Sequence, residues 1–173
     1  MRLNIIFVSF FSTLVLLFAI WFIYLAWFVE KPLEKNLLAI DGVQDVSVTR
    51  DRQQVQIDVA LGIDANLKTV HEAVLEAVKP YANGRELKMN FQDNPSPEME
   101  EAWHRLQFDV EEALSHHQYR ALPEITAAMK EELQLDKAVV DMNRQFVYFQ
   151  FQKGEYRHYL IYPRKQGEEG KGG

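Results

Sequence analysis

The chain of 173 residues contains no cysteine. Disulfide bonds, thiolate metal sites and cysteine nucleophiles are therefore excluded, although such an absence fits either side of a bacterial membrane. No serine lies in a G-x-S-x-G motif, and isolated turn glycines such as Gly62 and Gly84 form no phosphate-binding loop. Without these groupings, the sequence predicts a protein that is not an enzyme.

Positive charge is also scarce. Lysine and arginine total 19 against 25 acidic residues, which gives a formal net charge of −6. Nucleic-acid binding depends on clustered lysine and arginine side chains. We therefore expect no nucleic-acid partner.

Metal-binding motifs are missing as well. Glu100 with His104, and Glu112 with His116, stand four residues apart on a predicted helix, so each pair can share a face. The two pairs lie more than two turns apart, and no H-E-x-x-H motif occurs. We expect surface ion pairs and no cofactor; a metal-dependent enzyme using His104, His116 or His117 is the alternative.

The longest apolar run extends from Ile5 to Val29 and contains neither a charge nor a proline. About 20 apolar residues cross a bilayer core of roughly 30 Å, so this run predicts a tilted transmembrane helix. A cleaved signal peptide is the alternative, but its apolar core is shorter and the run ends without an A-x-A-like cleavage site. Trp21, Tyr24 and Trp27 mark its C-terminal half as a membrane interface.

The positive charges on the two sides of this anchor are nearly equal in number, so they give only a weak bias to its orientation. Arg2 and the α-amine precede the run, and Lys31 and Lys35 follow it. Lysine and arginine bias the orientation, whereas acidic residues count for little. A short N-terminal tail and a large C-terminal domain suit a signal anchor. We therefore expect a single-pass protein of the cell membrane with its C-terminal domain extracytoplasmic.

One face of the predicted anchor carries small side chains, and we name it the small-residue face. At 3-4-3-4-3 spacing it comprises Ser9, Ser12, Leu16, Ala19, Ile23 and Ala26. Small residues let helices approach closely in lipid, which indicates self-association or binding of a partner helix. An apolar helix without any partner can show the same spacing.

Residues 31–94 have the pattern of a small α/β unit. The expected elements are a helix at 31–40, strands at 43–50 and 54–61, a helix from 64 or 66 to 79, and a strand at 87–91. Alternating apolar and polar residues predict that the first two strands pair antiparallel with one buried face. Gly42 ends the first helix, Asp64 or Asn66 caps the second, and Pro80 follows it.

Within LLAIDGVQDVSV, the pattern L-x-x-I-x-G-V-x-x-V-x-V is formed by Leu37, Ile40, Gly42, Val43, Val46 and Val48. With the strand and valine-rich helix that follow, it resembles the ring-building motif of sporulation and secretion-channel proteins. It also resembles the alkaline-shock-protein family. The resemblance covers about residues 37–91 and implies a membrane-associated α/β unit within an assembly. Ferredoxin-like metal-binding domains share the pattern, but their cysteine pair is missing here.

Residues 95–164 predict a second unit of two helices and a β-hairpin. The expected elements are helices at 97–117 and 124–133, a short strand at 139–142 and hairpin strands at 145–152 and 156–162. The hairpin is rich in aromatic and branched residues. An aromatic binding surface is one interpretation and half-buried sheet packing is the other; the residues concerned are Trp103, Tyr148, Tyr156 and Tyr159.

Together these patterns predict an α+β protein. Its parts are an N-terminal transmembrane anchor at 1–30, units at 31–94 and 95–164 that form one domain or two, and a disordered tail at 165–173. We expect a membrane-anchored protein-interaction or scaffold protein of a bacterial membrane assembly, with protein partners or self-association. A membrane-tethered ligand sensor using the aromatic hairpin surface is the alternative.

Overall fold

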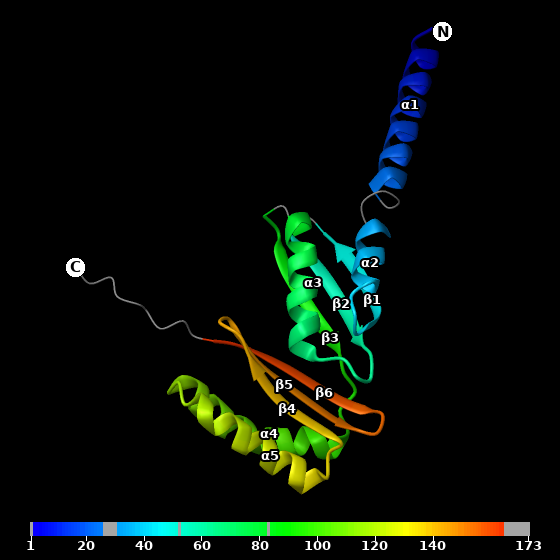
Figure 1. Ribbon diagram of the computed structural model, residues 1–173. Helices are drawn as coiled ribbons and strands as arrows, with labels where there is room; N and C mark the ends of the chain where they lie inside the picture. Colours follow the sequence, from blue (N-terminus) through cyan, green and yellow to red (C-terminus); the bar gives the residue numbers. More distant parts are fainter. Residues whose placement is uncertain (1, 26–30, 52, 83, 165–173) are drawn as a thin grey trace, which may run out of the picture.

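The computed structural model describes residues 2–25, 31–51, 53–82 and 84–164, so the expected tail and the end of the expected anchor lie outside the described residues. Within them the fold is mixed α+β, with five helices and two three-stranded sheets (Figure 1). The helices are α1 (Arg2–Leu25), α2 (Lys31–Leu38), α3 (Leu67–Ala82), α4 (Pro97–Ser115) and α5 (Leu122–Leu133), with a 3₁₀ turn, η2 (Tyr119–Ala121). The strands are β1 (Val43–Arg50), β2 (Gln54–Leu61), β3 (Glu86–Gln92), β4 (Lys137–Met142), β5 (Phe146–Lys153) and β6 (Tyr156–Pro163).

The first sheet has the order β1-β2-β3. Strands β1 and β2 pair antiparallel, as expected from their alternation, and β3 pairs parallel to β2. The parallel pair needs a crossover, which α3 supplies. Val55, Ile57 and Val59 of β2 are fully buried in one core with α2 and α3. The polar residues of β2 lie on the opposite face.

Helix α3 begins and ends in ways that the sequence only partly predicted. Asn66 Oδ1 accepts a hydrogen bond from the Thr69 N–H at 3.0 Å, so Asn66 caps the helix. Pro80 was expected to follow the helix, but α3 continues through Ala82. In the last turn a proline interrupts little of the hydrogen-bond ladder. Tyr81 packs against the core there, and the centre of its ring lies 5.9 Å from Arg50 Cζ.

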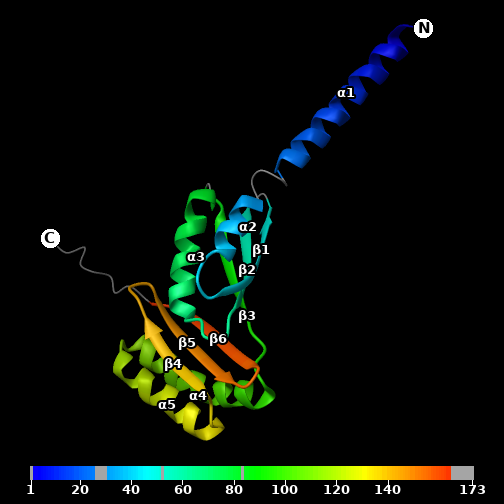
Figure 2. The ribbon, with the colours of Figure 1, turned by 45° about the vertical axis from the view of Figure 1, so that its right-hand side comes forward.

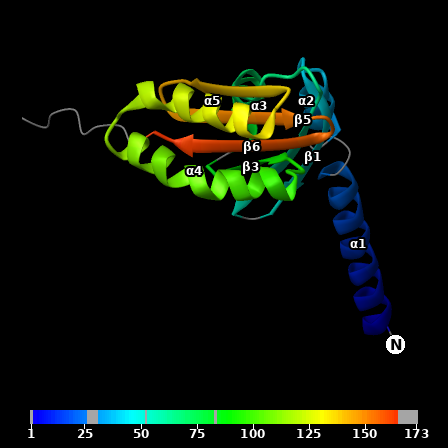
Figure 3. The same ribbon diagram turned by 90° about the horizontal axis from the view of Figure 1, so that it is seen from below.

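The second sheet has the order β4-β5-β6 and is antiparallel throughout, which confirms the expected hairpin. Helices α4 and α5 cover one of its faces side by side (Figure 3). Phe149 and Phe151 of β5 point to this face and pack with Trp103 of α4. Burying an aromatic or leucine side chain contributes about 1.5–3 kcal/mol. The face is therefore held mainly by apolar packing.

The helices of this unit differ slightly from the expected ranges. Ser96 Oγ accepts a hydrogen bond from the Met99 N–H at 3.3 Å and caps α4. The helix ends at Ser115, because His117 adopts the left-handed conformation with φ of 58°. Helix α5 starts at Leu122, which puts Pro123 in its first turn, where proline is tolerated.

The two sheets stay separate, and α3 contacts both of them (Figures 1 and 2). Tyr148 of β5 lies in the core of the first sheet. Lys68 of α3 forms a salt bridge of 3.0 Å with Asp141 of β4. At the other side of the contact, the Arg157 guanidinium donates to the Leu61 carbonyl at 3.2 Å. The units at 31–94 and 95–164 are thus joined by both apolar and polar contacts.

Helix α1 extends away from both sheets (Figure 1). All described side chains from Val8 to Trp21 are exposed, including Phe11 at 65% and Leu16 at 58%. Within the described residues, no helix combines the length and the apolarity that a membrane span requires.

Candidate functional site

Four members of the small-residue face lie among the described side chains. Ser9, Ser12, Leu16 and Ala19 are all exposed on α1. Ala26 and the side chain of Ile23 lie outside the described residues. The described part of this face therefore packs against no other described element and is open to a partner.

The four aromatic residues of the expected binding surface do not lie together. Trp103 is 5% exposed and packs between α4 and the second sheet. Tyr148 is 1% exposed and faces the opposite side of that sheet, toward α3. Tyr159 is half-buried against the same core as Tyr148, whereas Tyr156 is exposed near the hairpin turn. The sheet itself separates Trp103 from Tyr148, so these side chains cannot form one surface.

The histidines considered as metal ligands lie on the surface. His104, His116 and His117 are all exposed. No group of three or more potential metal ligands occurs in the part of the chain that the structure describes. His116 Nδ1 instead lies 3.0 Å from the Glu112 carbonyl oxygen and 3.1 Å from Ser115 Oγ, which are contacts local to the end of α4.

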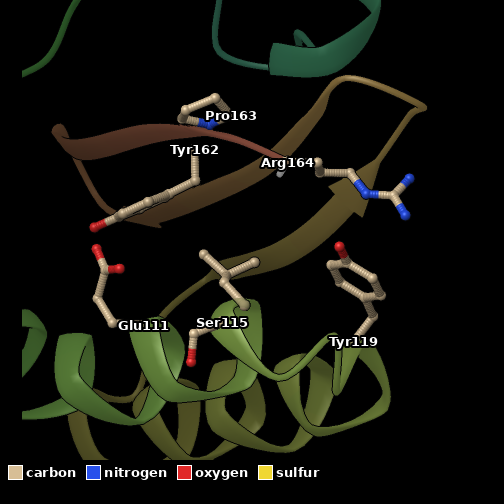
Figure 4. A pocket seen from close by; sticks show the side chains of 7 residues that line it. Glu111, Ser115, Tyr119, Tyr162, Pro163 and Arg164 are labelled. Atoms are coloured by element: carbon tan, nitrogen blue, oxygen red, sulfur yellow. The ribbon is translucent and has the colours of Figure 1, made fainter. Parts of the chain in front are cut away.

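A pocket of about 290 Å³ lies between the C-terminal half of α4, η2 and the end of β6 (Figure 4). Its volume is close to the lower limit of small-molecule sites, roughly 300–1,000 Å³. The residues that line it include Glu111, Leu114, Ser115, Tyr119, Tyr162 and Arg164. They bring one acidic and one basic side chain to the same cavity, with apolar and aromatic surface between them.

One end of this pocket is negative. The Glu111 carboxylate points toward the Tyr162 hydroxyl (Figure 4). Burial raises the pKa of Tyr162, and the charge of Glu111 raises it further. The phenol therefore stays protonated and can donate a hydrogen bond, while Glu111 supplies the charge. The Ser115 hydroxyl donates to the Glu112 carbonyl at 2.8 Å and is not directed to this end.

The other end is positive and firmly positioned. The Arg164 guanidinium lies 4.5 Å from the centre of the Tyr119 ring, which is a cation–π contact. Its Nη1 donates to the Asn143 carbonyl at 2.6 Å, and its backbone N–H donates to the Gln145 carbonyl at 2.7 Å. Arg164 Nε is buried and has no hydrogen-bond partner in the described structure, so contacts to a ligand fall to the terminal nitrogens. A planar guanidinium held in this way is suited to a carboxylate or phosphate group.

No pattern in the sequence predicted this pocket. Glu111 lies within the helix expected at 97–117, and Arg164 is the last residue of the second expected unit. No local motif joins them, because 53 residues separate 111 from 164 and the pocket forms only when α4 packs on the second sheet. Tyr162, the last residue of the hairpin strand expected at 156–162, was the available signal.

A buried polar chain links the two units beside α3. Asn143 Nδ2 donates to the Tyr148 hydroxyl at 2.9 Å, and that hydroxyl lies 3.0 Å from His71 Nδ1. Burial raises the pKa of Tyr148 to about 12 and lowers the pKa of His71. The hydroxyl therefore donates its proton to a neutral His71. This arrangement positions side chains across the contact and offers no reactive group to solvent.

No protein-family model, curated protein or solved structure matches this chain. The resemblance of residues 37–91 to ring-building and alkaline-shock proteins stays a prediction.

Proposed function

We propose that the protein is a single-pass membrane protein that acts without catalysis as an interaction or scaffold component of a bacterial membrane assembly. Its C-terminal α+β region lies outside the cytoplasm in this proposal. The observation that carries the proposal is the uncharged, proline-free run of 25 residues from Ile5 to Val29. A run of this length matches the bilayer core. It extends to Val29, four residues past the end of α1, so the finding that no described helix qualifies as a span concerns only part of the run.

The exposure of α1 supports the same proposal. Its described side chains from Val8 to Trp21 are apolar or small and are exposed around the whole helix. A helix that is apolar on all sides normally lies in a protein core or in lipid. In the described structure the sheets do not cover it, so lipid is the environment that accounts for its composition.

The α+β region offers surfaces for partners. β1 and β3 are the outer strands of the first sheet, and β4 and β6 are those of the second. An outer strand can accept an extended segment of a partner through backbone hydrogen bonds. The small-residue face of α1 is a second candidate surface, within the membrane. Both fit an assembly component better than an enzyme.

Membrane attachment is tested by fractionation. We expect the full chain to stay with membranes after an alkaline carbonate wash and to enter solution only with detergent. A variant that lacks residues 1–30 is the control and is expected in the soluble fraction. Release of the full chain by carbonate would exclude the anchor.

Orientation is tested with single cysteines, which the cysteine-free chain allows without background. Glu131→Cys places a thiol on an exposed site of α5, and Asn4→Cys places one before the apolar run. An impermeant maleimide is expected to label Glu131→Cys in intact cells and to reach Asn4→Cys only after the membrane is opened. Ala102→Cys, at a fully buried site, controls for unfolded protein. The reverse pattern would place the domain in the cytoplasm.

Assembly is tested by crosslinking in the native membrane. We expect discrete crosslinked species that contain this chain, either with itself or with other proteins. Recovery of the monomer alone, together with pulldowns that recover no partner, would contradict the scaffold proposal.

A further inference from the structure

The pocket between α4 and β6 has a feature that the scaffold proposal does not use. It presents a carboxylate, Glu111, and a guanidinium, Arg164, to one cavity of about 290 Å³. Within the described residues these two side chains form no salt bridge with each other. Figure 4 shows why: Glu111 points to the Tyr162 hydroxyl, whereas Arg164 lies over Tyr119 at the other end.

The contacts of Arg164 keep the two charges apart. The hydrogen bond from Nη1 to the Asn143 carbonyl and the stacking on Tyr119 hold the guanidinium at its end of the pocket. Asn143 is itself held, because its side chain donates to Glu72 at 2.7 Å and to Tyr148. Arg164 therefore cannot swing to Glu111 without losing this set of contacts.

Neither a simple cation nor a simple anion fits such a pocket well. A cavity of this volume is about 8 Å across if it is spherical, which is no more than the Debye length of roughly 8–10 Å. A bound cation would thus feel the repulsion of Arg164, and a bound anion that of Glu111. A ligand that carries both charges gains attraction at both ends.

We propose that this pocket is a binding site for a small zwitterion. Its cationic nitrogen contacts Glu111 and the Tyr162 hydroxyl oxygen, and its carboxylate contacts the Arg164 guanidinium. The apolar segment between the two groups lies against Leu114 and Pro163, which line the same cavity. This site is independent of membrane attachment, so either proposal can fail without the other.

Calorimetric titration of the full chain in detergent micelles tests the proposal. The probes are glycine, β-alanine, γ-aminobutyrate and ε-aminocaproate, which differ in the separation of their two charges. n-Butylamine and butyrate each carry one of the charges and serve as ligand controls. We expect one zwitterion of the series to bind at least about tenfold more tightly than either single-charge control, since both charge-assisted contacts contribute.

Two variants assign the ends of the site. Glu111→Gln and Arg164→Gln are each expected to weaken binding of the best zwitterion about tenfold or more. Glu112→Gln changes a neighbouring exposed carboxylate that does not line the pocket, and it should leave binding unchanged. Glu111 is exposed, so its variant is expected to fold even if Arg164→Gln does not. Thermal unfolding of each variant checks this.

Failure of the whole series to bind would refute the site. If n-butylamine binds as tightly as the zwitterions, only Glu111 recognises the ligand. If butyrate binds as tightly as the zwitterions, only Arg164 does. Either result, or loss of binding in Glu112→Gln to the same degree as in Glu111→Gln, would overturn the zwitterion proposal.

Discussion

Gln150 of β5 caps α3 of the other unit: its Oε1 accepts a hydrogen bond from the Leu67 N–H at 3.1 Å. The same amide donates from Nε2 to the Ala65 carbonyl at 2.8 Å. Gln150 is 3% exposed and Leu67 is 1% exposed, so water cannot replace either bond. Because 83 residues separate the two partners, this contact fixes the second sheet directly to the first helix turn of α3.

Replacing Gln150 with leucine is expected to lower the free energy of unfolding by about 1–3 kcal/mol, since a buried donor at Leu67 loses its partner. Chemical denaturation of the region 31–164 within the full chain measures this. Gln152→Leu is the matched control, because Gln152 is half-buried and makes only a long contact of 3.5 Å with the Gly154 carbonyl. Equal effects of the two substitutions would show that the cap does not stabilise the contact.

His71 makes stability depend on pH. Burial lowers its pKa below the ordinary 6.5, so the unfolded chain binds this proton more readily than the folded chain. Protonation would also set an N–H against the Tyr148 hydroxyl, which accepts from Asn143 and donates to His71. Glu72, the neighbouring acid, acts in the opposite direction but does not reverse the shift.

The free energy of unfolding is therefore expected to be unaffected by His71 above about pH 6.5 and to fall as the pH drops below it. The slope from one residue is at most about 1.4 kcal/mol per pH unit. His71→Leu should flatten this part of the profile, whatever its effect on overall stability. His104→Gln, at an exposed site, is the control and should leave the slope as it is. An unchanged slope in His71→Leu would contradict the assignment.

Gly42 is required for two separate reasons. Its φ is +89°, and an added Cβ would lie 2.9 Å from Ala65 Cβ and 3.0 Å from Val70 Cγ2. Gly84 also has a positive φ, +78°, but nothing lies within 4 Å of its Cβ position. Gly84→Ala thus reports the backbone strain alone, about 1 kcal/mol, and Gly42→Ala is expected to cost more. Thermal or denaturant unfolding compares them, and equal losses would show that the neighbours of Gly42 yield freely.

The sequence predicted most elements of the fold because their signals are local. Apolar alternation marked β1 and β2, and aromatic and branched residues marked the hairpin of β5 and β6. Gly42 marked the turn before β1, where only a residue tolerant of positive φ fits. Each of these signals lies within a few residues of the element that it specifies.

The parts that the sequence did not predict depend on contacts between distant residues. Pro80 normally ends a helix, but here α3 continues through Ala82, and Tyr81 packs against the core. Gln150 gave no local sign that it would cap α3. The opposite directions of Trp103 and Tyr148 follow from which helices cover each face of the second sheet. Glu111 and Arg164 line one cavity because α4 packs on this side of the second sheet.

The small-residue face of α1 can be tested as an association surface. If this face packs against a second copy or another helix in the membrane, a bulky side chain must weaken the association, since small residues permit close approach. Ser12→Phe and Ala19→Phe add bulk at exposed positions of this face, and Leu14→Phe adds it on the opposite side.

Energy transfer between labelled chains in lipid vesicles measures the association. We expect the first two variants to reduce the association at least about tenfold, or 1.4 kcal/mol, and Leu14→Phe to leave it nearly unchanged. Equal reductions by all three variants would show that added bulk weakens the association wherever it lies on α1. If no variant reduces the association, the small-residue face is not a contact surface, and assembly would depend on the α+β region.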